Sequence, residues 1–266
     1  MKTASVLTVY QEDPLNAGTS LAYLTQIFLT PSDWFFIRGH GTIPLVGRDT
    51  YRLVVKGMVQ HPLELSMEEL LTQFPQRQLV ATLICAGSRR NELVAIHPLP
   101  GEILWGADWI SILEDTAGVE EEARYVAFRG RDQAQVAGDL GHFCSSTRLE
   151  KVLTPEVLLV HEMNGAPLPR EHGFPLRILV PDYVGARSVK WLQDITLQSQ
   201  PSTNYFQARD YKTFPPTVAA ETVDWEQILS TYRENGRVCK KEGRGKAKKQ
   251  KKRSGYCSTM PQFLLQ

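Results

Sequence analysis

Runs of apolar residues of strand length recur along this chain, whereas long helical periodicities do not. Residues 51–59 are rich in β-branched side chains and partly alternate between apolar and polar positions, as half-buried strands do. Residues 78–85 form a continuous apolar run, which indicates a buried strand. The pair Asn164-Gly165 is a strong signal for a tight turn after a strand. Further strands are expected at residues 124–130, 156–163, 176–180 and 195–198.

Helices are expected to be few and short. Ser66, with Glu69 three residues later, matches a capping box, and the helix that it begins should end before Pro75. A second helix is predicted at residues 223–235, and residues 201–216 are predicted to be extended and rich in turns. This mixture favours an α+β fold of mixed sheets with short helices over a parallel array of βαβ units.

The composition of the chain indicates the cellular compartment in which the protein is expected. The chain has 266 residues, of which 42% are hydrophobic, and no stretch approaches the roughly 20 apolar residues of a membrane helix. The N-terminal residues do not resemble a secretory signal. The four cysteines form no C-x-x-C pair, which is typical of a reducing compartment. We therefore expect a soluble cytoplasmic protein without a membrane partner, and a mitochondrial or peroxisomal location stays open.

Charge divides the chain into two parts. Residues 240–253 carry nine Lys or Arg and one Glu, which leaves −7 for the rest of a chain whose net charge is +1. We predict a folded domain at residues 1–226, followed at 227–266 by the end of a helix and a disordered basic tail. Such a tail could also bind nucleic acid non-specifically or act as a nuclear-localisation signal.

A cysteine at the end of a predicted strand is the first candidate for chemistry. Cys85 is followed by small residues and by two arginines in the sequence CAGSRR. Small residues allow a bulky ligand to approach, and nearby cations favour the thiolate, which is the metal-binding form. Taken alone, the pattern fits a buried structural cysteine at least as well.

Four other segments carry charged or titratable residues at suggestive spacing. Arg38 and His40 alternate along an extended segment, so their side chains should lie on the same side. The sequence GARSVK at residues 185–190 could present backbone N–H groups and cations to a phosphate. The others are EMNGAPLPREHGFPLR at residues 162–177 and DYK at residues 210–212. Each segment is a weak signal by itself.

In their order along the chain, these segments resemble the molybdenum-cofactor (molybdopterin) domain of the sulfite oxidase family, which also occurs in assimilatory nitrate reductases. The resemblance begins with FFIRGHG at residues 35–41, continues through the segments above, and covers about residues 14–225. It implies the α+β molybdopterin-binding fold of that family, with a molybdenum–molybdopterin cofactor buried between sheets and loops.

The resemblance also implies a role for each matching residue. Cys85 would bind the molybdenum. The substrate pocket would contain Arg38, Arg90, Trp105 and Tyr211. The pterin and its phosphate would be held by His40, Asp132, His172, Arg177, Ser188, Val189 and Lys190.

The implied reaction is the oxidation of sulfite to sulfate by oxygen-atom transfer. No haem or flavin domain is recognisable, so the electron acceptor is expected to be external, such as cytochrome c or oxygen. A nitrate reductase-like activity and an inactive cofactor-binding paralogue are the alternatives.

Two departures from the family accompany the resemblance. Residues 105–113 form a stretch about ten residues shorter than is usual there, beside the expected pocket. The C-terminal dimerisation domain of the family is not recognisable, so we do not expect the usual homodimer.

Overall fold

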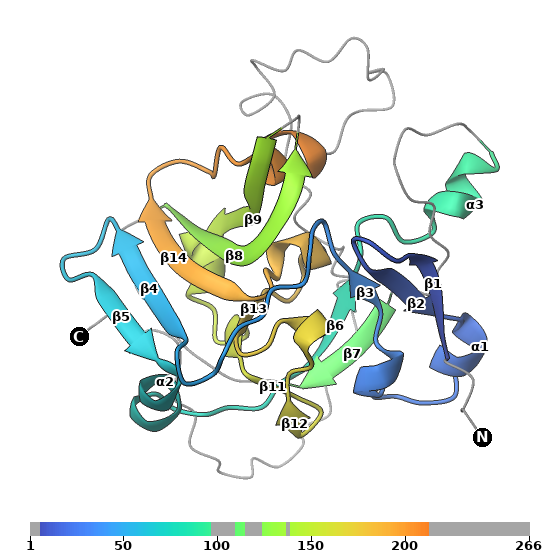
Figure 1. Cartoon of the computed structure of the whole chain (residues 1–266), viewed down its shortest axis with the longest axis horizontal. Helices are drawn as coiled ribbons and strands as arrows, with labels where there is room; N and C mark the ends of the chain where they lie inside the picture. Colours follow the sequence, from blue (N-terminus) through green and yellow to red (C-terminus); the bar gives the residue numbers. More distant parts are fainter. Residues whose placement is uncertain (1–5, 97–109, 115–123, 137–138, 213–266) are drawn as a thin grey trace, which may run out of the picture.

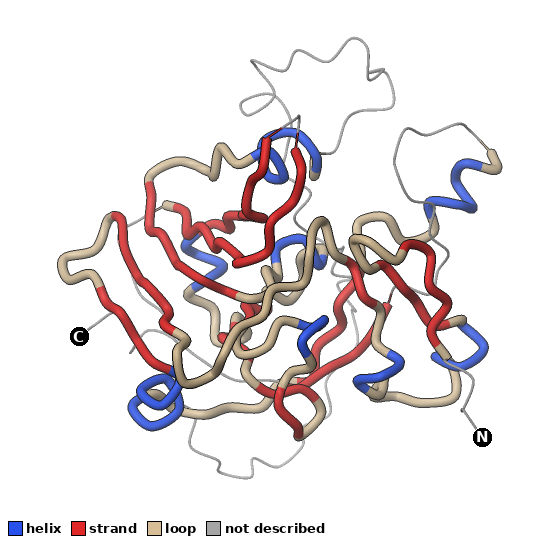
Figure 2. Tube along the Cα trace, in the orientation of Figure 1, coloured by secondary structure: helices blue, strands red, loops and turns tan. Residues whose placement is uncertain are grey.

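The structure is a computed structural model in which residues 6–96, 110–114, 124–136 and 139–212 are described. Strands dominate these residues, and the helices between them are short (Figure 2). Within the described residues, no helix is both long enough and apolar enough to cross a membrane. The α+β prediction is confirmed by this arrangement.

A five-stranded sheet forms the centre of the fold, with the order β5-β4-β14-β8-β9 (Figure 1). Its strands are β5 (Leu63–Ser66), β4 (Arg52–Gly57), β14 (Leu192–Gln198), β8 (Tyr125–Val136) and β9 (Asp139–Arg148). Only the β14–β4 pair is parallel, and the other three pairs are antiparallel. The mostly antiparallel pairing agrees with the sequence, because short helices cannot provide many parallel crossovers.

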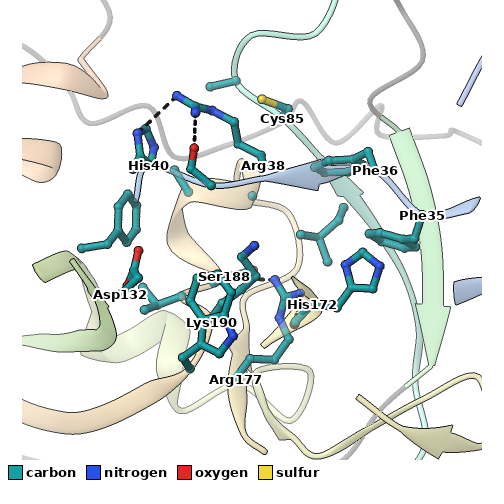
Figure 3. Close-up of a pocket in the computed structure, with 18 of the residues that line it drawn as sticks. Phe35, Phe36, Arg38, His40, Cys85, Asp132, His172, Arg177, Ser188 and Lys190 are labelled. Atoms are coloured by element: carbon teal, nitrogen blue, oxygen red, sulfur yellow. Dashed lines mark hydrogen bonds between the residues drawn. The ribbon is translucent and has the colours of Figure 1, made fainter. Parts of the chain in front are cut away.

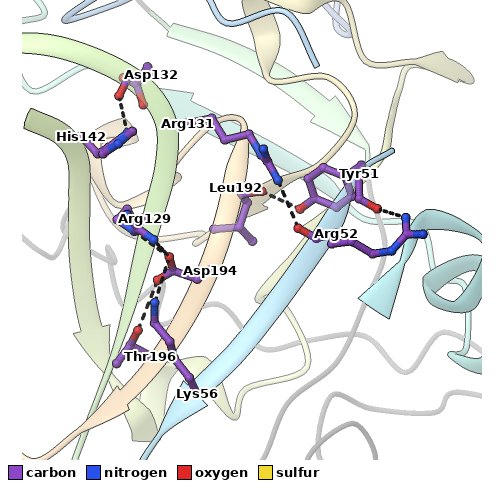
Figure 4. A network of polar contacts seen from close by, with 10 residues as sticks. All are labelled: Tyr51, Arg52, Lys56, Arg129, Arg131, Asp132, His142, Leu192, Asp194 and Thr196. Carbon is purple, nitrogen blue, oxygen red and sulfur yellow. Dashed lines mark hydrogen bonds and ion pairs between the residues drawn. The ribbon is translucent and has the colours of Figure 1, made fainter. Parts of the chain in front are cut away.

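A buried carboxylate ties three of these strands together (Figure 4). Asp194 on β14 is 3% exposed. Its Oδ2 accepts a hydrogen bond of 2.6 Å from Nε of Arg129 on β8 and lies 3.3 Å from Nζ of Lys56 on β4. The side chains of Lys56 and Arg129 are 43% and 34% exposed, so solvent screens these ion pairs and each contributes about 1 kcal/mol or less. The contacts connect β14 to both of its neighbours.

Smaller sheets surround the central one. The N-terminal sheet has the order β1-β2-β3, and the three other sheets are the pairs β6–β7, β10–β13 and β11–β12. Their strands are β1 (Leu7–Gln11), β2 (Asn16–Thr19), β3 (Ile37–Arg38), β6 (Val80–Ile84), β7 (Ile110–Glu114), β10 (Leu158–Val160), β11 (Glu162–Met163), β12 (Ala166–Pro167) and β13 (Arg177–Leu179).

The helical elements are single turns or a little more. The α-helices are α1 (Leu21–Leu24), α2 (Met67–Gln73), α3 (Arg90–Val94) and α4 (Leu149–Val152). The part of the chain that the structure describes also contains three 3₁₀ turns and one π-helix: η1 (Ser32–Trp34), η2 (Arg170–His172), η3 (Gly185–Arg187) and the π-helix η4 (Phe206–Asp210).

Two hydrophobic clusters form the core, and the β10–β13 pair separates them. Leu159 and Ile178 belong to the larger cluster beneath the central sheet. Leu158 and Leu179 belong to the smaller cluster beside β6. Neighbouring strand residues point to opposite faces, so this short pair contributes to both clusters.

Most of the predicted elements are confirmed. The capping box of Ser66 and Glu69 begins α2, which ends before Pro75. The Asn164-Gly165 turn closes the β11–β12 hairpin, and both residues have positive φ, as a type I′ turn requires. The strands predicted at 51–59, 78–85, 124–130, 176–180 and 195–198 correspond to β4, β6, β8, β13 and β14.

Two predictions are wrong in part. The strand predicted at 156–163 is two short strands, because the chain leaves the β10–β13 pair before it enters the next hairpin. Residues 201–216 are not extended throughout, because Phe206–Asp210 is a π-helix. The predicted helix at 223–235, the basic tail and the domain boundary at 226 lie outside the described residues.

Candidate active site

A buried pocket lies between the two hydrophobic clusters. Its walls include Leu83 and Phe36 from the smaller cluster, and Phe143 and Val189 from the larger one. The empty space between these walls is about 670 Å³, part of which is open to solvent. Ten of the residues singled out by sequence line it: Arg38, His40, Cys85, Asp132, His172, Arg177, Ser188, Val189, Lys190 and Tyr211.

The sequence-predicted residues face one another across this pocket (Figure 3). Arg38, His40 and Cys85 lie along one side, and Ser188, Lys190 and Arg177 lie along the other. The two sides come from segments that are far apart in the sequence, so only the tertiary fold brings them together.

Cys85 follows directly on the end of β6. Its side chain is buried, and its Sγ accepts a hydrogen bond from the Gly87 N–H at 3.3 Å. Burial raises the pKa of the thiol, while that hydrogen bond and the charges of Arg38 and Arg90 oppose the rise. A soft cation bound at the sulfur would favour the thiolate in the same direction as these neighbours.

Arg38, His40 and Tyr211 form a hydrogen-bonded chain along the upper wall. Nη2 of Arg38 lies 3.2 Å from Nδ1 of His40, and Nε2 of His40 lies 2.7 Å from the Tyr211 hydroxyl. This contact confirms that Arg38 and His40 point to the same side. Burial, Arg38 and Lys190 lower the pKa of His40, so the imidazole is neutral.

The donor and the acceptor in each hydrogen bond of this series follow from the chemistry of the three side chains. A guanidinium only donates, so Nδ1 of His40 accepts, and the proton of the neutral ring sits on Nε2. His40 therefore donates to the oxygen of Tyr211. This leaves the tyrosine O–H to donate into the cavity. Burial raises the pKa of Tyr211 well above its usual value, which keeps that proton in place.

The opposite wall holds the groups suited to a phosphate. Arg177 donates to the backbone oxygens of His172 at 3.0 Å and of Ser188 at 2.9 Å. Nζ of Lys190 donates to the Glu171 carbonyl at 2.7 Å and lies 4.3 Å from the ring centroid of Trp191. These bonds bring two cations to one end of the pocket.

The pKa values of Lys190 and Asp132 indicate which kind of ligand this wall favours. Burial, reinforced by Arg177, lowers the pKa of Lys190 to about 7, and Asp132 opposes that change. Burial raises the pKa of Asp132 to about 6, and Lys190 opposes that rise. An anionic ligand beside Lys190 would stabilise its charge. The electrostatics therefore favour a ligand with a negatively charged end.

Asp132 also has an unused acceptor. The residue is 4% exposed, and its Oδ1 has no hydrogen-bond partner among the described residues. Buried polar atoms without partners are rare in folded proteins. A ligand edge that carries N–H groups would satisfy this oxygen, as a pterin ring could. The donor set of this wall thus fits a molecule with a heterocycle and a phosphate.

A metal ion would depend on such an organic ligand. Within the described part of the chain, no three His, Cys, Asp or Glu residues lie close enough together to hold a metal ion. Cys85 can offer one soft sulfur, which suits a metal whose remaining ligands come with a cofactor.

Two predicted residues are not placed in the pocket. Arg90, the first residue of α3, does not line the cavity, although its charge reaches both Cys85 and Tyr211. Trp105 lies outside the described residues, as does most of the stretch at 105–113. Their predicted roles stay predictions.

The aromatic wall beside His40 was not predicted. Phe143 stacks on the imidazole with ring centroids 5.1 Å apart, and Phe206 lies 4.5 Å from it. Neither residue belongs to a segment that the sequence singled out. Phe35, Phe36 and Trp191 also line the pocket, and their positions inside the motifs were the available signal.

Comparison with known proteins identifies this arrangement at the family level. The oxidoreductase molybdopterin binding domain model matches residues 40–206. The chain is 39% identical over 233 residues to the sulfite oxidase of Gallus gallus, which covers 82% of this chain and 50% of that protein. It is 34% identical over 238 residues to the sulfite oxidase of Arabidopsis thaliana, with 82% and 60% covered.

More distant relatives extend the comparison. The chain is 32% identical over 241 residues to nitrate reductase (NADH) 1 of Phaseolus vulgaris, which covers 85% of this chain and 27% of that protein. The sulfane dehydrogenase SoxCD of Paracoccus pantotrophus shares the fold, with a TM-score of 0.62 and 23% identity over 81% of this chain and 53% of that one. The chain thus spans about half the length of the sulfite oxidases, and less of the nitrate reductase.

Proposed function

We propose that this chain, which belongs to the oxidoreductase molybdopterin binding domain family, is a molybdenum-dependent enzyme that oxidises sulfite to sulfate. One observation carries the proposal: a single buried pocket joins the Cys85 thiol, the Arg38–His40–Tyr211 chain and the cations Arg177 and Lys190. The first can bind the metal, the second can receive a small anion, and the third can hold a phosphate.

The cofactor would be held from both sides of the pocket. Cys85 would bind the molybdenum, and Asp132 would accept hydrogen bonds from the pterin through its unpartnered oxygen. The phosphate would lie against Lys190, Arg177 and Ser188, where two cations line the pocket. His172 and Val189 complete this wall, and His40 borders the cofactor on the side of the substrate.

The pocket residues would then bind and orient the substrate. When bound, the cofactor supplies the two-electron oxygen-atom exchange that no side chain here can perform. Arg38, which is half-buried, would offer a cation to the sulfite oxyanion, and Arg90 would add positive charge from the start of α3. Tyr211, which accepts from His40, would direct its O–H toward the reacting oxygen and hold the proton there.

The decisive experiment measures molybdenum per chain. The wild type and a Cys85→Ser variant would be produced in cells that make molybdopterin. Cys144→Ser is the matched control, because Cys144 is also a partly shielded free thiol but does not line the pocket. We expect near-stoichiometric molybdenum in the wild type and the control, and loss of the metal in Cys85→Ser.

Activity is then assayed on the loaded chains. Sulfite-dependent reduction of cytochrome c, present in the wild type and absent from Cys85→Ser, is the expected result. A wild-type chain without molybdenum would refute the proposal. Bound metal without electron transfer from sulfite would favour the alternative of an inactive cofactor-binding paralogue.

A nitrate reductase-like activity is the second candidate. It is favoured by the similarity to the Phaseolus vulgaris nitrate reductase, which covers as much of this chain as the sulfite oxidases do. A small oxyanion with three oxygens would meet the same Arg38. Reduction of nitrate by the loaded chain with a dye donor, without sulfite oxidation, would select this reading.

The partners follow from the same proposal. We infer an electron acceptor of the cytochrome type, or oxygen, from the similarity to the sulfite oxidases. The expectations of a cytoplasmic location and of no homodimer stay predictions. Size-exclusion chromatography coupled to light scattering tests the second of them.

A further inference from the structure

Arg187 is a fully buried arginine that lies next to the pocket without lining it. It is 0% exposed and is the last residue of η3, directly before Ser188, Val189 and Lys190. Burial of a guanidinium is unfavourable unless the charge is hydrogen-bonded. The polar groups that contact Arg187 therefore stabilise its buried position.

Those contacts lead to the element that precedes Tyr211. Nη1 of Arg187 donates to Oγ of Ser145 on β9 at 2.7 Å and to Oε1 of Gln207. Gln207 is also 0% exposed and lies in the π-helix η4. Tyr211 follows η4 directly, and its N–H donates to the Phe206 carbonyl at 3.1 Å.

The oxygen of Gln207 collects three donors. Besides Arg187, it accepts from Oγ of Ser145 at 3.0 Å and from the Ser146 N–H at 3.1 Å. Its Nε2 has no partner among the described residues. A backbone N–H and a guanidinium cannot accept, so the amide cannot be turned round. Oε1 of Gln207 thus binds both Arg187 and strand β9, and this orientation leaves Nε2 of Gln207 without a partner among the described residues.

This geometry has a direct consequence for the active site. The hydrogen bond between Arg187 and Gln207 connects two parts of the site: residues 188–190, which follow Arg187, and Tyr211, which follows the π-helix that contains Gln207. An apolar pair could fill the same space, but it would not fix the rotation of η4, because apolar contacts have no direction. π-Helical turns are frequent at functional sites, where they set the aim of a side chain.

We propose that Arg187 is a positioning residue, which joins the Ser188–Lys190 segment to η4 and so sets the place of the Tyr211 hydroxyl beside His40. The proposal rests on the proposed function only in taking Tyr211 and Lys190 as parts of one active site. Arg187 itself touches neither substrate nor cofactor.

The test follows Tyr211 itself by fluorine NMR. The full chain is labelled with 3-fluorotyrosine, and the Tyr211 resonance is assigned by its absence from a Tyr211→Phe variant. His40→Leu, which has no donor, gives the resonance position of a tyrosine that has lost its partner. Arg187→Met is expected to move the Tyr211 resonance toward that position, although Arg187 does not contact Tyr211.

Conservative and control variants separate positioning from packing. Gln207→Glu keeps the acceptor oxygen, so the resonance should stay at its wild-type position. Arg187→Lys, with fewer donors, should give an intermediate shift. Thr147→Val is the matched control, because Thr147 is a buried β9 residue whose hydroxyl has no partner among the described residues. It should not move the resonance.

Two outcomes would overturn the proposal: an unmoved Tyr211 resonance in Arg187→Met, or an equal shift in Thr147→Val. If Arg187→Met does not fold, the double variant Arg187→Met/Gln207→Met replaces it, because removing both polar partners leaves no unpaired charge. The same shift is expected there, and its absence would likewise refute the proposal.

A kinetic readout complements the resonance. In the loaded enzyme, Arg187→Met should lower kcat about tenfold to a hundredfold, with a smaller change in the KM for sulfite, as a misplaced catalytic group does. A wild-type chain that binds no molybdopterin would refute the proposed function instead. The fluorine shifts of that same chain would still decide the role of Arg187.

Discussion

His172 shows how the burial of one residue can set the pH range in which the protein is stable. It is 2% exposed, and its Nε2 lies 3.0 Å from the Ser32 carbonyl, to which it donates in the neutral form. Burial, Lys190 and Arg177 lower its pKa to about 3, and the hydrogen bond to Ser32 only partly opposes them. The folded protein therefore keeps this ring neutral where an unfolded chain would protonate it.

We predict that this histidine makes the protein less stable in acid. Between about pH 6.5 and pH 3 the unfolded chain binds a proton that the folded chain refuses, so the free energy of unfolding falls as the pH falls. The loss approaches about 1.4 kcal/mol per pH unit for one such residue. Urea unfolding of the wild type and His172→Gln between pH 4 and pH 8 measures it.

The variant isolates this effect from an opposing one. Asp132, whose pKa is raised to about 6, binds its proton more readily in the folded state and so stabilises the protein as the pH falls toward 4. The difference in slope between wild type and His172→Gln removes that contribution. His61→Gln, at an exposed site, is the control. Equal slopes in all three proteins would contradict the prediction.

At the level of residues, the sequence predicts site residues that lie within recognisable motifs, but it does not predict contacts that form only in the buried core. Arg38, Cys85 and Lys190 lie within short segments of recognisable order, so their convergence could be anticipated. Arg187 lies within such a segment too, but its importance depends on Gln207, which belongs to no motif. No sequence rule pairs two polar residues that lie 20 positions apart and meet only in the core.

Among the elements, the segment after β3 lies close against strand β8. Thr42 bridges to Gln133, and a Cβ added at Gly41 would lie 1.8 Å from the Gln133 carbonyl oxygen. Backbone atoms on both sides leave no flexible group to give way. The glycine therefore allows the Arg38–His40 segment to lie directly on β8.

Gly41→Ala is expected to push these two elements apart. The overpacking should cost about 1–3 kcal/mol of stability, measured by urea unfolding, and should lower the molybdenum content by displacing His40. Gly141→Ala is the matched control, because a Cβ at Gly141 meets nothing within 4 Å. If the two alanine variants had the same midpoint and metal content, the close approach would have no consequence.

Two elements beside the site, β9 and η4, were missed because neither shows an apolar period in the sequence. β9 buries three consecutive polar residues, Ser145, Ser146 and Thr147, which lie on both of its faces, so this part of the strand shows no alternation of apolar and polar residues. The Ser145 hydroxyl and the Ser146 N–H donate to Gln207, and the Ser146 hydroxyl accepts from the Ser202 N–H. The π-helix η4 has only five residues, too few for a periodic pattern. Strands with an apolar face, such as β6 and β14, were predicted.

For the whole molecule, the pocket separates the two hydrophobic clusters and places charged side chains between them. The larger cluster lies under the central sheet, the smaller one lies beside β6, and the site occupies the space between them. Cations that face a cavity without an anion oppose folding. A cofactor that contacts both sides would therefore stabilise the entire protein.

We expect the loaded chain to unfold at a higher temperature than the same chain made in cells without molybdopterin. A ligand that binds only the folded state at a hundred times its Kd adds about 2.7 kcal/mol. Differential scanning fluorimetry of the two preparations measures the difference. The Cys85→Ser chain should behave like the cofactor-free preparation in both hosts. Identical unfolding temperatures for loaded and unloaded wild type would exclude this coupling.

The contact between His40 and Tyr211 spans 171 positions of sequence, and this separation affects how the protein is synthesised. A ribosome adds roughly 5–20 residues per second, so about 10–35 s pass between the emergence of the two sides of the pocket. During that time the nascent chain carries Cys85, the predicted molybdenum ligand, but has no enclosed site. The pocket can therefore close around a cofactor only after the segment that carries Tyr211 has been synthesised.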